Sequence, residues 1–347
     1  MSPKTGFFIV LLLLFLNFNV IINLTYANER SDLKMKEEFD FYSPTALKSY
    51  NLDQTMRYQL SMLENLDVFT RKHSENVANL TCRICEYLHE NQRFTIYATI
   101  CAYLHDIGKL FIPPSILQKP GPLTDEEFEI MKTHTTIGYN ICMKDLKLRP
   151  YAAGPLYHHE GLDGSGYPQG LTKKDIPYVG QIIRVADEYD AIVSKRQYKT
   201  HVSISETLKL LIKDAQPSSY IRPVALDNLS SDYKVGKINK KALRALFKVV
   251  IDDTNYEINC VYEYVSYLEE QIKRLEQIDR YHDQMEKAKN EKKKNYYSEG
   301  MKMLFSQGET FENYKEVLEE YKEAYKVRKD VIKKLYEEIK IIKKLRV

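Results

Sequence analysis

The stretch that decides the fold is His105-Asp-Ile-Gly-Lys109, followed further along the chain by His158-His-Glu-Gly-Leu-Asp-Gly-Ser-Gly-Tyr-Pro168. Ile96, Ile100 and Leu104 precede the first segment at helical spacing. This spacing predicts a helix that delivers a histidine and an aspartate at its end, where the following glycine stops it. The second segment begins with a histidine pair and runs into a glycine-rich loop.

Three more residues of the same chemistry lie around these segments, namely His73, His134 and Asp187. One histidine in a helix is usually a core or surface residue, and Asp163 or Asp187 alone could be a turn or cap. An adjacent His-Asp, an adjacent His-His, two further histidines and a distant aspartate together match what a first-row divalent metal binds. Neighbours in a helix point about 100° apart, so an adjacent pair can serve two metals or two faces of one cluster.

Helical periodicity dominates the middle of the chain, and no convincing run of period-two alternation interrupts it. We therefore predict an all-α bundle with the polar cluster in its middle. The expected elements are a helix over 77–88 with His73 at its start, a helix opened by a Thr124/Glu127 capping box that carries His134, a helix ending at His158 and His159, a loop over 161–170, and a helix over 182–192 that carries Asp187.

Composition narrows the classes of function. The 347 residues are 44% hydrophobic, and the net charge of +3 comes from 51 basic and 48 acidic residues. Such a balanced surface does not indicate bulk nucleic-acid binding, although a local site could still take a small anion. Four of the five cysteines fall on apolar helix faces, which indicates reduced core thiols in a cytosolic domain; Cys82 and Cys85 form a lone CxxC, for which packing is favoured over zinc or redox use.

The amino terminus carries a membrane-directed segment. The apolar run from Phe7 to Ile22 lies within about two dozen uncharged residues, enough for one crossing at roughly 20 residues. Thr25-Tyr26-Ala27 is a tolerable cleavage site, so a cleaved signal peptide with export is the alternative to an anchor. Basic residues flank the run on both sides, and their balance slightly favours a cytoplasmic body. The expected organisation is a membrane segment at 1–28, a linker at 29–56, a catalytic domain at 57–255 and a helical region at 256–347.

The carboxyl-terminal region repeats a three-four apolar spacing twice, from Val261 to Leu275 and from Tyr314 to Ile342. Gly300 and Gly308 fall between the two runs and are expected to interrupt the helical structure there. The pattern predicts a helical hairpin or short coiled coil, either a structural appendage or a homodimerisation or regulatory module.

Taken together, these motifs resemble the HD-GYP family of bacterial phosphodiesterases. The resemblance covers about residues 57–255 and also includes Ile112-Pro-Pro114, Lys119-Pro-Gly-Pro-Leu-Thr124, Asp175-Ile-Pro177 and Asp187-Glu-Tyr-Asp-Ala191. It implies an all-helical HD-superfamily catalytic domain that hydrolyses cyclic di-GMP in signal transduction. GGDEF-type cyclases would be partners.

The resemblance also implies roles for individual residues. His73, His105, Asp106 and Asp187 would hold one metal, and His134, His158 and His159 would hold the other, with Asp106 bridging. The imidazole-rich ligand set favours two ions of iron or manganese. Asp106 and Lys109 would be the catalytic residues, with Lys109 placed to contact the scissile phosphate or assist the leaving oxygen. The substrate-binding set is Lys109, Asp163, Tyr167, Pro168, Arg196 and Lys199.

Two departures from the family pattern carry their own expectations. Gly161 and Leu162 replace an arginine and an aromatic residue, which predicts a looser loop or an altered guanine pocket. Phe69 stands where some members have a third-metal glutamate, which predicts two metals and leaves the product, linear pGpG or GMP, open. Two rival functions are a weakly catalytic scaffold for diguanylate cyclases and an HD phosphohydrolase for another cyclic dinucleotide.

Overall fold

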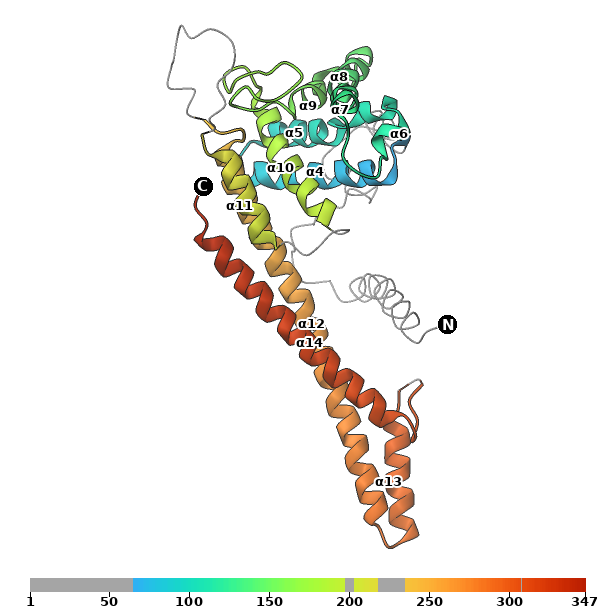
Figure 1. The fold of residues 1–347 in the computed structure, drawn as a ribbon. Coiled ribbons are helices and arrows are strands. Elements are labelled where there is room, and N and C mark those ends of the chain that lie inside the picture. The colour runs from blue at the N-terminus through green and yellow to red at the C-terminus, as the bar shows by residue number, and fades with distance from the viewer. Residues whose placement is uncertain (1–64, 197–202, 218–234, 307) are drawn as a thin grey trace. The chain divides into compact units, whose positions relative to one another are not determined.

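The computed structural model describes residues 65–196, 203–217, 235–306 and 308–347 (Figure 1). Within these ranges the regular structure is helical, apart from one isolated bridge between Asp163 and Thr172, so the predicted all-α class is confirmed there. No helix in these ranges is long and apolar enough to cross a bilayer. The predicted membrane segment at 1–28 and the linker at 29–56 lie outside the described residues.

The first part of the described chain forms a bundle, called here the N-terminal bundle. Helix α4 packs against α5 and α10, and α9 packs against α5, α8 and α10. The elements of the bundle are α4 (Val68–Tyr87), α5 (Gln92–Leu104), η2 (Ile107–Phe111), α6 (Pro114–Leu117), α7 (Asp125–Lys132), α8 (His134–Lys144), η3 (Arg149–Tyr151), α9 (Ala153–Tyr157), α10 (Tyr178–Arg196) and α11 (Ile204–Ala215).

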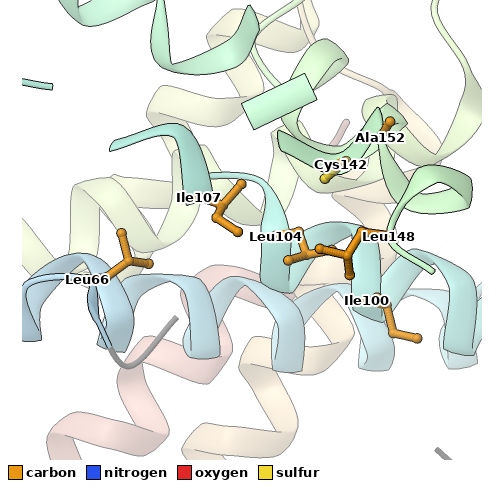
Figure 2. Packing of buried hydrophobic residues seen from close by; sticks show 7 residues of the cluster. All are labelled: Leu66, Ile100, Leu104, Ile107, Cys142, Leu148 and Ala152. Atoms are coloured by element: carbon orange, nitrogen blue, oxygen red, sulfur yellow. The ribbon is translucent and has the colours of Figure 1, made fainter. Parts of the chain in front are cut away.

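Apolar packing fixes the end of α5, where the His-Asp pair follows. Ile100 and Leu104 of α5 and Ile107 of η2 are buried against Cys142 of α8 and Leu148, as Figure 2 shows. Full burial of each leucine or isoleucine side chain contributes about 1.5–3 kcal/mol. The turn between α5 and η2 is therefore held on both sides by the core.

The prediction that four of the five cysteines are free thiols in the core is confirmed. All five thiols are free, and Cys82, Cys85, Cys101 and Cys142 are buried, whereas Cys260 is partly buried. Both cysteines of the CxxC belong to the buried face of α4.

The helix expected to carry His134 is divided in two. The capping box is present, because the Thr124 hydroxyl accepts the Glu127 N–H and the Glu127 carboxylate accepts the Thr124 N–H. However, α7 ends at Lys132, and His134 begins α8. The Thr133 hydroxyl donates to the Ile130 carbonyl at 2.6 Å, and such back-bonding competes with the helical ladder. The prediction that this capped helix carries His134 was therefore wrong.

The second part of the described chain is a helical arm made of α12 (Lys240–Lys287), α13 (Glu291–Leu304) and α14 (Tyr314–Lys344). Both α13 and α14 pack on α12 (Figure 1). The predicted boundary between residues 255 and 256 lies inside α12, which continues through it. Where α12 packs on α4, Arg83 pairs with Asp253 and Tyr87 bonds to Asp252.

The arm contains one helix more than the predicted hairpin. Gly300 does not interrupt the chain but lies within α13, where an added Cβ would come 2.9 Å from the Tyr281 ring of α12. Glycine at this position lets the two helices approach closely. Gly308 does separate α13 from α14, and its φ of +88° is a conformation that favours glycine.

Candidate metal centre

The seven predicted ligands come from five places in the bundle and converge on one cluster. His73 lies in the second turn of α4, Asp187 lies in α10, and His134 begins α8. The two adjacent pairs follow helix ends, His105-Asp106 after α5 and His158-His159 after α9. Helix ends allow neighbouring side chains to turn inward together, which a continuous helix does not allow.

The cluster contains two groups with metal-ligand geometry. His73, His105 and Asp106 form one, and His134, His158 and His159 form the other; within each, the ligand atoms lie within 4.8 Å of one another. The bundle therefore places the predicted ligands of each metal side by side.

Asp106 faces both groups with different oxygen atoms. Its Oδ2 lies 3.3 Å from His105 Nε2 and 3.8 Å from His73 Nε2. Its Oδ1 lies 3.4 Å from His134 Nε2 and 4.0 Å from His158 Nε2. A carboxylate that presents one oxygen to each group is suited to bridge two cations.

Asp187 makes a second link between the groups. Its Oδ1 lies 2.9 Å from His73 Nε2 and 3.8 Å from His105 Nε2, and its Oδ2 lies 3.8 Å from His159 Nδ1. Sequence reasoning placed Asp187 with the first group, and the structure puts its second oxygen next to the second group.

Backbone carbonyls fix the tautomers of three histidines. The Nδ1 atoms of His105, His134 and His158 lie 2.6–3.0 Å from carbonyl oxygens three or four residues earlier in the chain. Because a carbonyl only accepts, each Nδ1 must carry the proton, and in the neutral ring each Nε2 presents a lone pair to the cluster. The Nε2 atoms of His134 and His158 are 3.2 Å apart, so two lone pairs face each other.

The pKa values of most cluster residues also favour the protonation states that bind metals. Burial lowers the pKa of His134, lowers that of His158 well below its usual value, and lowers that of His159 to about 3. Burial alone would raise the pKa of Asp106, but its electrostatic interactions with His105 and Lys109 hold it well below its usual value. Neutral imidazoles and charged carboxylates are the forms that ligate metals.

His73 differs from the other histidines because carboxylates surround it. Its Nδ1 lies 2.6 Å from Asp190 Oδ2, and Asn76 donates to the other oxygen of Asp190 at 3.0 Å. Burial opposes protonation, but hydrogen bonds to Asp187 and Asp190 raise the pKa of His73 to about 10. A carboxylate on the far nitrogen of a ligating histidine orients the ring and increases its basicity. Asp190 was not singled out from the sequence, although its position one turn after Asp187 places both on one helix face.

Buried polar atoms without hydrogen-bond partners indicate that the cluster fits divalent cations. His105 Nε2 and Asp106 Oδ1 are buried and have no hydrogen-bond partner among the described residues. Leaving a buried polar atom unpaired costs about 1–3 kcal/mol, and more for a charged group. Facing lone pairs and an unpartnered carboxylate oxygen are all satisfied by positive charge placed between them.

Lys109 lies at the edge of the cluster on η2. Its Nζ is 2.6 Å from Asp106 Oδ2. Burial disfavours the ammonium, but the Asp106 carboxylate more than offsets this and raises the pKa of Lys109. The side chain is thus held as a cation beside the carboxylate that faces both groups.

The glycine-rich loop brings Tyr167 onto the cluster. The Tyr167 ring stacks on His159, with centroids 4.6 Å apart, and its N–H donates to the His159 carbonyl at 3.1 Å. Gly166 has no space for a side chain, since a Cβ would come 2.1 Å from Gly161 N. Pro168 follows, exposed to solvent.

Glu160 closes this loop, a role that the sequence analysis missed. Its side chain is buried, and its two oxygens accept the N–H groups of Gln169 at 2.7 Å and Leu171 at 2.8 Å. One carboxylate directly after the histidine pair thereby ties the loop back to the cluster.

The departures at Gly161 and Leu162 do not loosen the loop. Leu162 is buried, its N–H donates to the Lys237 carbonyl at 2.9 Å, and its own carbonyl accepts from Lys173 at 3.0 Å. The Asp163 carboxylate accepts the Ser165 N–H and hydroxyl at 3.0 and 2.6 Å, so it shapes the turn. These hydrogen bonds hold the loop in place without the arginine; a looser loop or an altered guanine pocket relative to the family stays a prediction.

The remaining predicted substrate residues are only partly placed. Arg196 ends α10, and its side chain lies outside the described residues, as does Lys199. Phe69 stands where some family members have a third-metal glutamate, and 71% of its surface is exposed.

Comparison with known families agrees with this geometry. The family model described as an HD domain matches residues 57–220, a range that includes all seven clustered residues. This region is therefore similar to an HD domain, and the clustered histidines and aspartates, two groups of which could hold a metal ion, lie within it.

Curated relatives define the branch of this class. The matched region is 47% identical over 153 residues to a cyclic di-GMP phosphodiesterase of Thermotoga maritima, covering 43% of this chain and 42% of the relative. It is 39% identical over 143 residues to the cyclic di-GMP phosphodiesterase PdeB of Borreliella burgdorferi, covering 41% and 38%. It is 35% identical over 143 residues to the 3'3'-cGAMP-specific phosphodiesterase 3 of Vibrio cholerae, covering 41% and 31%. The matched region is similar to the HD-GYP type of cyclic dinucleotide phosphodiesterase, and the chain spans less than half the length of these relatives.

Proposed function

We propose that this chain is a metal-dependent phosphodiesterase that hydrolyses cyclic di-GMP to linear pGpG. The observation that carries the proposal is Asp106, whose two oxygens face two separate groups of histidines. Two of the relatives described above bear the name cyclic di-GMP phosphodiesterase, which supports the substrate.

Each group of ligands would hold one cation. His73 and His105 would bind the first and the histidines His134, His158 and His159 the second, with Asp106 and Asp187 between them. The imidazole-rich set favours iron or manganese over magnesium. When bound, a pair of such cations would supply a nucleophile near neutral pH and offset the charge of the phosphodiester.

In the proposed reaction, Lys109 would donate a proton to the leaving oxygen. Its ammonium already sits 2.6 Å from Asp106 Oδ2, at the edge of the cluster where a phosphodiester would approach. From there Nζ would bind a phosphate oxygen and give its proton to the leaving ribose oxygen. Asp106 would hold Lys109 in this place as well as facing both histidine groups.

Tyr167 and Pro168 would contact the nucleoside. Tyr167 is backed by His159 on the cluster side, and Pro168 is exposed next to it, so the pair forms a wall beside the proposed ions. Arg196 and Lys199, after the last metal-facing aspartate, would contribute charge-assisted contacts to the second phosphate.

The experiment measures turnover by the full-length chain loaded with Mn²⁺ or, without oxygen, with Fe²⁺. Chromatography should show pGpG formed from cyclic di-GMP and would show whether GMP follows. A His105→Ala/Asp106→Ala double variant should lose turnover, and Asp330→Asn in the arm serves as the control. Equal turnover in the double variant would refute the metal mechanism. Bound metal without any turnover by the unmodified chain would instead favour a scaffold that binds cyclases.

A hybrid cyclic dinucleotide is the second candidate substrate. The relative from Vibrio cholerae is named for 3'3'-cGAMP, and its match to this chain is of similar extent to that of PdeB. Comparing kcat/KM for the two dinucleotides decides between them. A clear preference for 3'3'-cGAMP would replace cyclic di-GMP in the proposal.

We further propose that residues 1–28 anchor the chain in the bacterial cell membrane, with the catalytic region in the cytoplasm where cyclase partners act. The apolar run and its basic flanks support this orientation. Protease added outside intact cells should leave the catalytic region uncut, whereas an exported protein would be digested or released.

A further inference from the structure

Three side chains, of which Phe128 is exposed and the other two are partly buried, form a shelf at the rim of the cluster, called here the aromatic shelf. It consists of Phe128 and Lys132 on α7 and Tyr167 in the glycine-rich loop. Phe128 and Tyr167 meet edge to face, with centroids 6.2 Å apart. Lys132 Nζ lies 4.8 Å from the Phe128 ring centroid and 5.7 Å from that of Tyr167. The three side chains are therefore close enough to contact one small molecule together.

Phe128 lies outside the buried core. No residue of α7 is buried, and Phe128 is 43% exposed. The Tyr167 ring that it meets is stacked on His159 of the metal-facing cluster. Exposed aromatic rings beside a polar site are typical of ligand contacts, and a nucleobase stacks on such rings with about 1–3 kcal/mol per base.

Lys132 has a different position from the other ammonium at this site. Lys109 Nζ lies against Asp106 in the cluster, where a phosphate would bind. Lys132 Nζ lies over two aromatic rings instead, and Glu129 Oε1 holds it there at 2.6 Å. A base that packs against these rings beside the ammonium would present its edge to Nζ, whereas the phosphate would lie with Lys109.

We propose that Lys132 determines base specificity by donating to O6 of a guanine that rests on the aromatic shelf, with N7 as a second acceptor. This inference rests on the proposed function and deepens it. Lysine and arginine pair with these two purine acceptors. Adenine carries an amino group in place of O6. This group is a hydrogen-bond donor and cannot accept from the ammonium, so adenine would bind the aromatic shelf less tightly than guanine.

The test is the direction of cleavage of 3'3'-cGAMP by the full-length, Mn²⁺-loaded chain. This dinucleotide has one guanine, one adenine and two phosphodiesters, so the base on the shelf decides which bond is cut. Chromatography separates the products pGpA and pApG. The unmodified chain should yield one isomer in about fivefold or greater excess, a single donor contact lying at the low end of base discrimination. Lys132→Met should bring the ratio close to one, and Lys132→Arg should preserve the excess.

The matched control is Lys144→Met, an exposed lysine of α8 away from the shelf, which should leave the ratio unchanged. An intramolecular ratio does not depend on how much enzyme is folded or loaded with metal. Equal isomers from the unmodified chain, or an unchanged excess in Lys132→Met, would overturn the proposal. A uniform loss of rate with the excess preserved would make Lys132 a phosphate or structural contact, which also overturns it.

Failure of the proposed function gives a different result. If the unmodified chain cleaves no cyclic dinucleotide, equilibrium binding of cyclic di-GMP and cyclic di-AMP still tests the shelf. The proposal predicts about fivefold tighter binding of cyclic di-GMP by the unmodified chain. It further predicts that Lys132→Met loses this preference, and the same preference in both proteins would refute it.

Discussion

The N-terminal bundle and the helical arm bury different kinds of residue. At the centre of the bundle His105, Asp106 and His158 are almost fully buried, and two of their polar atoms have no hydrogen-bond partner among the described residues. In the arm the buried clusters are mostly apolar, and charged side chains pair with one another, as Arg274 does with Glu309. Buried unpaired polar groups destabilise a fold. The comparison indicates that the bundle gives up stability to hold a site, whereas the arm is organised for packing.

The largest expected effect comes from Asp106→Asn. An amide offers one acceptor oxygen where the carboxylate faces two groups, so the link between them is lost. We expect kcat/KM for cyclic di-GMP to fall about a thousandfold, which corresponds to the several kcal/mol that bound metals supply. Bound manganese per chain, measured by mass spectrometry, should fall as well. Activity within tenfold of the unmodified chain would contradict a bridging role.

The effect of metal removal on the melting temperature gives a second test of the site in the bundle. A chelator should lower the melting temperature of the metal-loaded chain, because ligands that bind only the folded state stabilise it. The same chelator should have little effect on Asp106→Asn. A drop of equal size in both proteins would place the stabilising metal elsewhere.

A smaller loss is expected from Asp190→Asn. This carboxylate holds the far nitrogen of His73 at 2.6 Å, and removing such a partner typically costs 10- to 100-fold in metal affinity or activity. The matched control is Asp330→Asn, an exposed aspartate of α14, which should change neither. Metal titration under competition with a chelator measures the affinity. Unchanged affinity would mean that Asp187 alone orients His73.

Glu160→Gln should act on the loop and not on the metals. Glutamine can accept only one of the two N–H groups that the carboxylate now accepts, so Tyr167 loses its fixed place. We expect KM to rise about tenfold, the equivalent of one charge-assisted hydrogen bond. Metal content should stay the same. A loss of metal with no change in KM would show that Glu160 supports the histidines instead.

The smallest effect on activity is expected from Glu309→Gln in the arm. Arg274 binds both Glu309 oxygens at 2.6 Å, and this pairing lowers the pKa of Glu309. Its stabilisation is therefore present above the unfolded pKa of about 4.3 and is lost as the pH falls through the folded value. Activity should stay within about twofold, and the unfolding free energy at pH 7 should fall by about 1 kcal/mol. The difference between variant and unmodified chain should disappear in acid, and a difference that persists there would exclude the ion pair as its cause.

Sequence patterns predicted the site better than they predicted the boundaries of the helices around it. The His-Asp pair after α5, the capping box and the helix with Asp187 follow from periodicity and local motifs, and the structure confirms each of these elements. The break before His134 depends on threonine hydroxyls that compete for carbonyls, which periodicity does not register. Gly300 was taken as an interruption because its use, a close approach of Tyr281, is visible only once α12 and α13 are packed.

The supporting residues of the site were missed for a related reason. Asp190 contacts a predicted ligand and Glu160 contacts the loop, but neither contact is apparent from the order of the sequence. Asp190 reaches His73 across 117 positions, and Glu160 binds backbone groups, which leave no mark in side-chain patterns. Helical spacing from Asp187 would have found the first, and no pattern would have found the second.

The buried cysteines of the bundle have a consequence for the question of compartment. Burial raises the pKa of Cys85, Cys101 and Cys142 to about 12, so almost none of each thiol is ionised at neutral pH. Only the thiolate reacts readily with oxidants or disulfides. These sulfurs would therefore stay reduced on either side of a membrane, and their lack of bridges is no evidence for the cytoplasm. The partly buried Cys260 of α12 is the thiol whose oxidation state, read by alkylation in cells, would report where the protein resides.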